Sequence, residues 1–281
     1  MDSTGVLWIG GGSGAGKSTL ARRLAYRHDL RLHPVDAYTF AHLERTDPQR
    51  HPVMARTHAR DYRQSHVDPS AEQQAANFVD YAAERFGMIV EDIEARGSGP
   101  LVIVEGPQLL PHLVQPVMAD SEHGVWLLPT TDFTARSLGI RNSPTPLAQE
   151  SDKDRARRLR LERDALLTEW IRRDAAERDL TVVEMNGGQG EDESEQELAE
   201  LFAAVLEAGP RARDGAERHA IRQEENAVAN RQIAAFRASL GDDAPPEGEF
   251  PFACECTDLG CDAQVELTPS AYRAAGGAVA H

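Results

Sequence analysis

The chain has 281 residues, with 46 Asp and Glu side chains against 30 Lys and Arg, and its formal net charge is −16. Such an excess of negative charge disfavours general binding to nucleic acids, because their phosphates are held by Lys and Arg. No apolar stretch approaches the roughly 18 uninterrupted residues that cross a bilayer. The composition therefore predicts a soluble protein with neither nucleic acid nor a membrane as a partner.

Two local features predict a cytoplasmic location. Residues 1–5 carry no basic side chain, which argues against a secretory signal. The three cysteines all lie within residues 254–261, and so few thiols suit a reducing compartment better than a disulfide framework.

Short apolar runs alternate with helical patterns in the first three quarters of the chain. Strands are predicted at residues 6–9, 30–35, 101–105, 124–128 and 180–185, and the longer helices at residues 71–94, 151–179 and 195–208. Residues 40–75 are polar, with scattered Pro, Arg and His. Continuous apolar strands separated by helices are typical of a parallel sheet with helices on both faces. We therefore predict the α/β class for this part of the chain.

A Gly-Pro pair at residues 209–210 suggests a domain boundary, with one unit at residues 1–208 and a second at residues 209–281. The second unit begins with a helix predicted at residues 215–240, whose sparse apolar stripe needs a partner. An acidic, Pro-containing linker at residues 241–248 follows, and the rest holds the three cysteines. We expect a small helical, cysteine-containing C-terminal module.

One motif carries the clearest chemistry. Gly11-Gly12-Ser13-Gly14-Ala15-Gly16-Lys17-Ser18 fits the pattern Gly, any four residues, Gly, Lys, Ser, and it lies between a predicted strand and a predicted helix. Glycines let backbone N–H groups approach phosphate oxygens, and the following helix dipole adds positive potential. Lys17 is expected to contact the β- and γ-phosphates of ATP, and Ser18 to ligate Mg²⁺. Thr19 completes the expected nucleotide-binding set.

With this loop, and without a downstream Asn-Lys-x-Asp or Leu-Ser-Gly-Gly-Gln sequence, the chain resembles the P-loop kinases that act on small molecules. This group includes nucleoside, nucleotide, shikimate and gluconate kinases, and the resemblance covers roughly residues 5–207. It implies transfer of the γ-phosphoryl group of ATP to a small-molecule acceptor.

The resemblance also implies roles for single residues. Asp36, at the end of the second strand, matches the residue that accepts the acceptor's proton, and Glu105 matches an acidic residue for magnesium. Arg157 and Arg160 lie in a stretch, residues 151–164, that resembles the lid of these kinases. Arg136 and the turn at residues 186–188 resemble positions near the adenine. The alternatives are a turn-forming Asp36, a solvent-facing Glu105 and solvated helix faces for the arginines.

The acceptor site is expected between the second strand and the long helix at residues 71–94. Aromatic and cationic side chains gather in that part of the sequence and would suit a polar, ring-bearing acceptor: Tyr38, Phe40, His58, Arg60, Tyr62, Arg63 and His66.

Cys254, Cys256 and Cys261 form the remaining group. Three thiolates in eight residues could bind zinc, with His281 or His219 as a fourth ligand, but plain thiols are an equal alternative. The tail resembles a small C-terminal module seen on actinobacterial proteins. A second hypothesis for the whole chain follows: a nucleotide-binding regulatory protein without a small-molecule acceptor, acting on a protein partner through this module.

Overall fold

A computed structural model of the chain describes residues 3–140, 150–276 and 279–280. Five parallel strands form one sheet in the order β2-β3-β1-β4-β5. Their bounds are β1 Val6–Gly11, β2 Arg31–Pro34, β3 Val102–Glu105, β4 Gly124–Pro129 and β5 Thr181–Met185. All five predicted strands are confirmed, and so is the α/β class.

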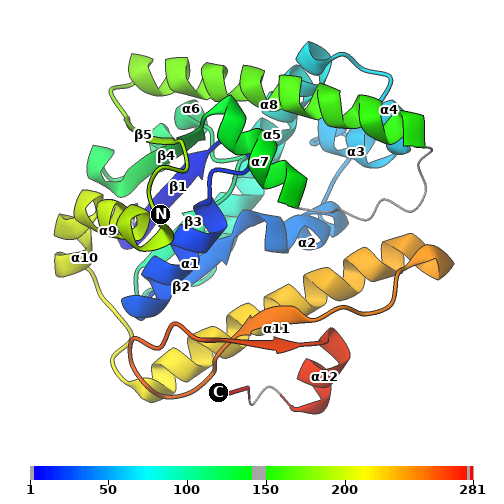
Figure 1. The fold of residues 1–281 in the computed structure, drawn as a ribbon. Coiled ribbons are helices and arrows are strands. Elements are labelled where there is room, and N and C mark those ends of the chain that lie inside the picture. The colour runs from blue at the N-terminus through cyan, green and yellow to red at the C-terminus, as the bar shows by residue number, and fades with distance from the viewer. Residues whose placement is uncertain (1–2, 141–149, 277–278, 281) are drawn as a thin grey trace.

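Helices cover both faces of this sheet (Figure 1). The helices whose side chains join the two apolar clusters on these faces are α1 (Lys17–Arg27), α5 (Ala71–Glu94), α8 (Glu150–Glu177), α9 (Glu191–Leu201) and the short α10 (Ala203–Ala208). Side chains of α1, α9 and α10 join one apolar cluster, which contains Leu7 and Ile9 of β1. Side chains of α5 and α8 join a second cluster around Trp8 and Trp126. Since Leu7 and Trp8 are neighbours in β1, the two clusters lie on opposite faces of the sheet.

Shorter elements connect these layers. Three short helices, α2 (Thr39–Glu44), α3 (Pro52–His58) and α4 (Tyr62–His66), occupy the polar stretch for which the sequence analysis assigned no element. The 3₁₀ turns and remaining short helices are η1 (Ser3–Gly5), η2 (Val35–Tyr38), α6 (Pro111–Val114), η3 (Gln115–Val117), η4 (Ser121–His123) and α7 (Thr131–Ile140).

The C-terminal part contains a feature that the sequence did not predict. Its helix α11 spans Gly215–Leu240, as expected, and is followed by η5 (Gly241–Asp243). Two short strands, β6 (Phe250–Ala253) and β7 (Gln264–Leu267), then pair antiparallel before α12 (Pro269–Ala274). The module is therefore a helix packed on a hairpin rather than purely helical. The rings of Phe252 and Tyr272 stack with centroids 4.3 Å apart at its centre.

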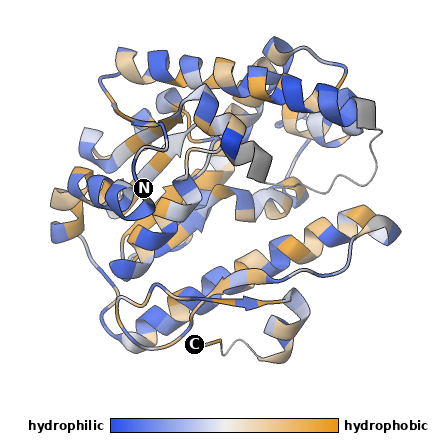
Figure 2. Cartoon of the chain, viewed as in Figure 1, coloured by the Kyte–Doolittle hydropathy of each residue, from blue (hydrophilic) through white to orange (hydrophobic). Residues whose placement is uncertain are grey.

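Helix α11 lies along the β2 side of the sheet (Figure 1) and contacts β2, η2 and α2. Apolar and polar residues are mixed along it, whereas the strands of the central sheet are largely apolar (Figure 2). These contacts supply the partner that its sparse apolar stripe required. The division of the chain at residue 208 remains our proposal. Within the described residues, every helix is too short or too polar to cross a membrane.

Candidate functional site

The glycine-rich loop closes between β1 and α1. The amide of Gly12 donates to the carbonyl oxygen of Leu127 in β4 at 2.9 Å, so the loop starts tight against the sheet. Gly11 has φ +119°, and a Cβ added there would lie 2.1 Å from the same carbonyl oxygen. Gly16 has φ +83° and immediately precedes the first residue of α1. The loop therefore needs glycine at these positions for backbone conformation and close approach.

Lys17 begins α1 and turns back into the loop. Its Nζ donates to the carbonyl oxygen of Gly12 at 2.7 Å, and the residue is only 6% exposed. Ser18 is exposed in the first turn of α1, and Thr19 is half-buried beside it. The Lys17 ammonium group, the loop backbone and the first turn of α1 therefore lie close together.

The predicted acidic residues lie at the same edge of the sheet. Glu105 ends β3 opposite Ile9 of β1 and Pro34 of β2, and it is 4% exposed. Asp36 follows two residues after Pro34, in η2, and is exposed. Because parallel strands bring their carboxyl ends together, both carboxylates share the edge with the glycine-rich loop.

Two side chains that form hydrogen bonds with the Asp36 segment were not predicted from the sequence. The side-chain amide of Gln108 donates to Asp36 Oδ1 at 3.2 Å. Arg85 of α5 is 1% exposed and donates from Nη2 to the carbonyl oxygen of Val35 at 2.6 Å. Burial lowers the pKa of Arg85. No local pattern marks either residue, since each acts through the position of its side chain beside η2.

A small cavity adjoins the loop on the β5 side. Its volume is about 120 Å³, and its lining joins the start of α1 to the turn after β5. Arg136 lies next to this turn, donating from Nη2 to the carbonyl oxygen of Asn186 at 2.9 Å. The residues that line the cavity are Ala15, Gly16, Thr19, Leu20, Phe133, Glu184, Met185, Asn186, Gly187, Gln189, Gly190, Glu191 and Ser194. Both elements that the resemblance places near the adenine therefore meet here.

A wider cavity of about 1240 Å³ lies elsewhere, beside the starts of β1 and β3. Its lining includes Thr4, Val102 and Arg211, and it contains no residue of the glycine-rich loop. This wide cavity is therefore not the candidate functional site. The residues with the chemistry of a nucleotide site lie around the glycine-rich loop, at the opposite edge of the sheet.

The predicted lid residues belong to the unbroken helix α8, which packs against α4 and α5. Arg157 is exposed. Arg160 forms an ion pair from Nε to Asp164 Oδ2 at 3.8 Å, and Asp164 also accepts from Arg163 at 2.6 Å. The role of Arg157 and Arg160 toward phosphates stays a prediction.

The expected acceptor residues belong to different elements of the fold. Tyr38 stacks on His33 with ring centroids 4.1 Å apart, and Phe40 packs against Phe236 of α11. By contrast, Tyr62 and Arg63 belong to α4, which contacts α8. The neighbours of these side chains therefore differ, and an acceptor site formed by them stays a prediction.

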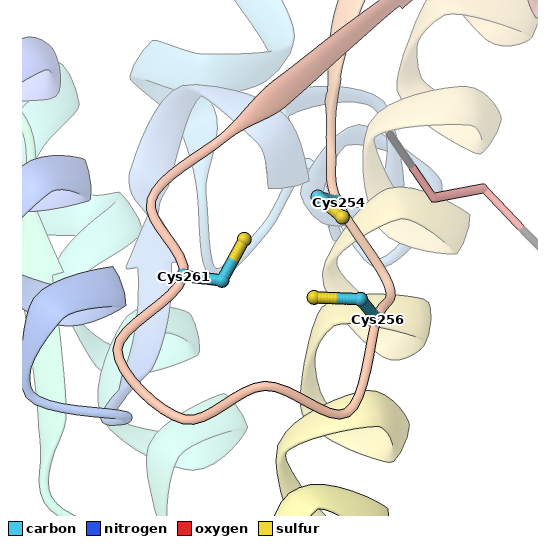
Figure 3. Close-up of side chains that lie close together, drawn as sticks. All are labelled: Cys254, Cys256 and Cys261. Carbon is cyan, nitrogen blue, oxygen red and sulfur yellow. The ribbon is translucent and has the colours of Figure 1, made fainter.

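The three cysteines do come together. The sulfur atoms of Cys254, Cys256 and Cys261 lie within 4.8 Å of one another and point into the same loop (Figure 3). All three are free thiols, Cys254 buried and the others half-buried. Burial raises the pKa of Cys261 to about 11. His281 lies outside the described residues. The Nδ1 atom of His219 contacts the carbonyl oxygen of Glu255.

No protein-family model and no curated protein matches this sequence. Among solved structures, the chain is similar to the shikimate kinase of Bacteroides thetaiotaomicron, at 17% identity and a TM-score of 0.41, over 70% of this chain and 98% of that one. It is also similar to the shikimate kinase of Acinetobacter baumannii in complex with shikimate, at 14% identity and a TM-score of 0.38, over 71% and 93%. These likenesses concern the fold alone.

Proposed function

We propose that this protein transfers the γ-phosphoryl group of ATP to a small-molecule acceptor. The observation that carries the proposal is the glycine-rich loop, in which Gly11 and Gly12 have no room for a Cβ and Lys17 turns inward. At Gly12 a Cβ would lie 2.5 Å from Cδ of Pro129 and 3.0 Å from Oγ1 of Thr168. Glycines in such a loop let backbone N–H groups approach the oxygens of a chain of phosphates.

The oxygen donors at the site suit magnesium. Mg²⁺ prefers hydroxyl, carboxylate and water oxygens, and Ser18 and Glu105 provide a hydroxyl and a carboxylate at the loop edge of the sheet. When bound with ATP, the ion would neutralise oxygens of the β- and γ-phosphates. Arg136, Thr19 and the turn at Asn186 would surround the base.

In the proposed reaction an oxygen of the acceptor attacks the γ-phosphorus and the bond to the β-phosphate oxygen breaks, so that ADP leaves. Asp36 would receive the proton of an acceptor hydroxyl and orient its oxygen, while Gln108 holds Asp36 from the side. Lys17 would stabilise the negative charge that develops on the transferred group. Arg157 and Arg160 would add charge from the lid. The proposed setting is the cytoplasm.

The test is ADP release with ATP and Mg²⁺ against a panel of nucleosides, sugars, hydroxylated ring acids and small phosphorylated acceptors. Lys17→Ala should reduce acceptor-dependent release by roughly 100-fold or more, with an unchanged circular-dichroism spectrum. Asp36→Asn should reduce turnover by roughly 100-fold with little change in ATP affinity. Asp80→Asn, at an exposed carboxylate on α5, is the matched control. Wild-type turnover in Lys17→Ala would contradict the proposal.

One observation favours the second hypothesis, a nucleotide-responsive regulatory protein. The C-terminal helix α11 bonds to α2, which directly follows the η2 turn that carries Asp36: Gln232 Oε1 accepts from the amide of Phe40 at 3.1 Å. A change at the site could therefore be passed to the module and to a protein partner. Tight ATP binding with no stimulation by any acceptor would favour this hypothesis over the kinase.

A further inference from the structure

The loop between β6 and β7 brings three sulfur atoms to one point. It contains Cys254, Cys256 and Cys261, whose side chains converge from both ends of the loop (Figure 3). The apolar cluster of the module is built from Phe252, Tyr272 and neighbours, without the cysteines. Packing of the module therefore does not account for three thiols that face one another.

A single arginine of α11 organises this loop. The guanidinium of Arg218 donates to the carbonyl oxygens of all three cysteines, at 3.2 Å for Cys254 and 2.7 Å for Cys261, with the bond to Cys256 shorter still. Its Nη1 lies 3.7 Å from Cys256 Sγ, and the side chain is 1% exposed. One buried cation thus fixes the backbone at every cysteine and places positive charge beside the sulfurs.

The loop is also bonded to the α/β unit. Both carboxylate oxygens of Asp29 accept from the amide of Gly260 at 2.9 Å, and Asp29 Oδ1 lies 3.4 Å from Arg218 Nε. Arg27 Nε lies 3.3 Å from Asp262 Oδ2. The backbone that carries the sulfurs is therefore held by contacts that do not involve the sulfurs themselves.

We infer that Cys254, Cys256 and Cys261 bind one thiophilic divalent ion, of which Zn²⁺ is the commonest, through three thiolates. Zinc–sulfur bonds of 2.3 Å in a tetrahedron set the sulfurs about 3.8 Å apart, which small side-chain rotations reach from the present arrangement. The three thiols release their protons to solvent on binding. The ion with three thiolates carries a charge of about −1, and the adjacent Arg218 compensates it.

Among the described residues no fourth protein ligand joins the three cysteines, so there the fourth position is open to water or an added ligand. Within the described part of the chain the cluster contains only the three cysteines. The competing use of these thiols, a disulfide between two of them, needs an oxidant and leaves the third sulfur unused.

Metal binding is measured directly and independently of any kinase activity. We would purify the full chain without chelator, determine bound zinc by mass spectrometry, and titrate the reduced metal-free protein with Co²⁺, following thiolate-to-cobalt absorption. The expected result is one ion per chain. Cys256→Ser should weaken Co²⁺ binding by at least 10-fold, whereas Thr257→Ser, which alters the same loop without removing a thiol, should bind as the wild type does.

A chelator should lower the melting temperature of the wild type and of Thr257→Ser, and should change that of Cys256→Ser much less. Because the Co²⁺ titration of the wild type needs no variant, a misfolded Cys256→Ser protein leaves the test intact. Failure of the reduced wild type to take up either ion, or equal binding by Cys256→Ser, would overturn the inference.

Discussion

The ion pair that holds α11 against β2 allows a quantitative prediction. Glu225 accepts from the amide of Leu32 at 2.7 Å through Oε1 and from Arg222 Nη1 at 2.8 Å through Oε2. The strand β2 lies at the edge of the sheet, so the Leu32 amide has no strand on that side with which to pair. Arg222 is 0% exposed, and its guanidinium lies 4.2 Å from the ring centroid of Tyr26. Replacement of Glu225 by Ala therefore leaves both a buried cation and an amide without this carboxylate.

The magnitude follows from these losses. Removing one partner of a buried ion pair costs about 3–5 kcal/mol, and an unpaired buried amide about 1–3 kcal/mol. Arg222 retains its bond to the carbonyl oxygen of Leu30, so we expect a total near the lower end, about 4 kcal/mol for Glu225→Ala. Glu225→Gln keeps an acceptor for the Leu32 amide and should cost about 2 kcal/mol.

The assay is urea unfolding followed by tryptophan fluorescence. Burial raises the pKa of Glu225, so the unfolding is run in mildly alkaline buffer, which favours the carboxylate. Glu224→Gln, at an exposed neighbour on the same helix, is the control and should change the free energy of unfolding by less than about 0.5 kcal/mol. Hydrogen exchange at the Leu32 amide should accelerate in Glu225→Ala only. If Glu225→Ala lay within about 1 kcal/mol of the wild type, the docking of α11 would not depend on this pair.

Three further changes test other parts of the structure. Gly11→Ala should lower the free energy of unfolding by at least about 2 kcal/mol and abolish ATP binding in a calorimetric titration, since its Cβ would lie 2.1 Å from the Leu127 carbonyl oxygen. Normal ATP affinity would contradict the assigned loop geometry. Burial holds the pKa of His33 well below its usual range, so as pH drops below about 6.5 the unfolded chain binds a proton that the folded chain does not, and stability falls. Between pH 6.5 and 5.5 this histidine should lower the free energy of unfolding by about 1 kcal/mol. Urea unfolding of His33→Gln should show a pH dependence smaller by that amount. Asn226→Ala should expose the hairpin to proteolysis, because the Asn226 side chain bonds both the amide and the carbonyl oxygen of Ala253 at 2.8 and 2.9 Å; unchanged cleavage of residues 250–267 would argue against that role.

Local sequence pattern determined the central part of this protein. Continuous apolar runs predicted all five strands, and the bounds of the helices at residues 71–94 and 215–240 agree with the structure. The spacing of glycine and lysine around Gly16 and Lys17 located the loop, because backbone conformation and phosphate chemistry restrict the residue types there. The carboxyl-edge positions of Asp36 and Glu105 followed from strand ends in a parallel sheet.

The C-terminal hairpin was decided by tertiary contacts. Its strands have four residues each, and Pro251 lies inside β6, where proline argues against a strand. The hairpin is held by Asn226 and by the stacked rings of Phe252 and Tyr272. None of these contacts has a periodic signature in the sequence.

The connection between the two parts of the chain also had to come from the structure. Arg218 bonds the three cysteine carbonyls and pairs with Asp29, and Glu225 bonds an amide 193 positions away along the chain. Periodicity and motif spacing report only neighbours within one element. A buried charge, by contrast, is satisfied by whichever partner the fold brings to it. The sequence alone therefore identified the glycine-rich loop and the thiols. Only the tertiary structure showed which contacts hold them in place.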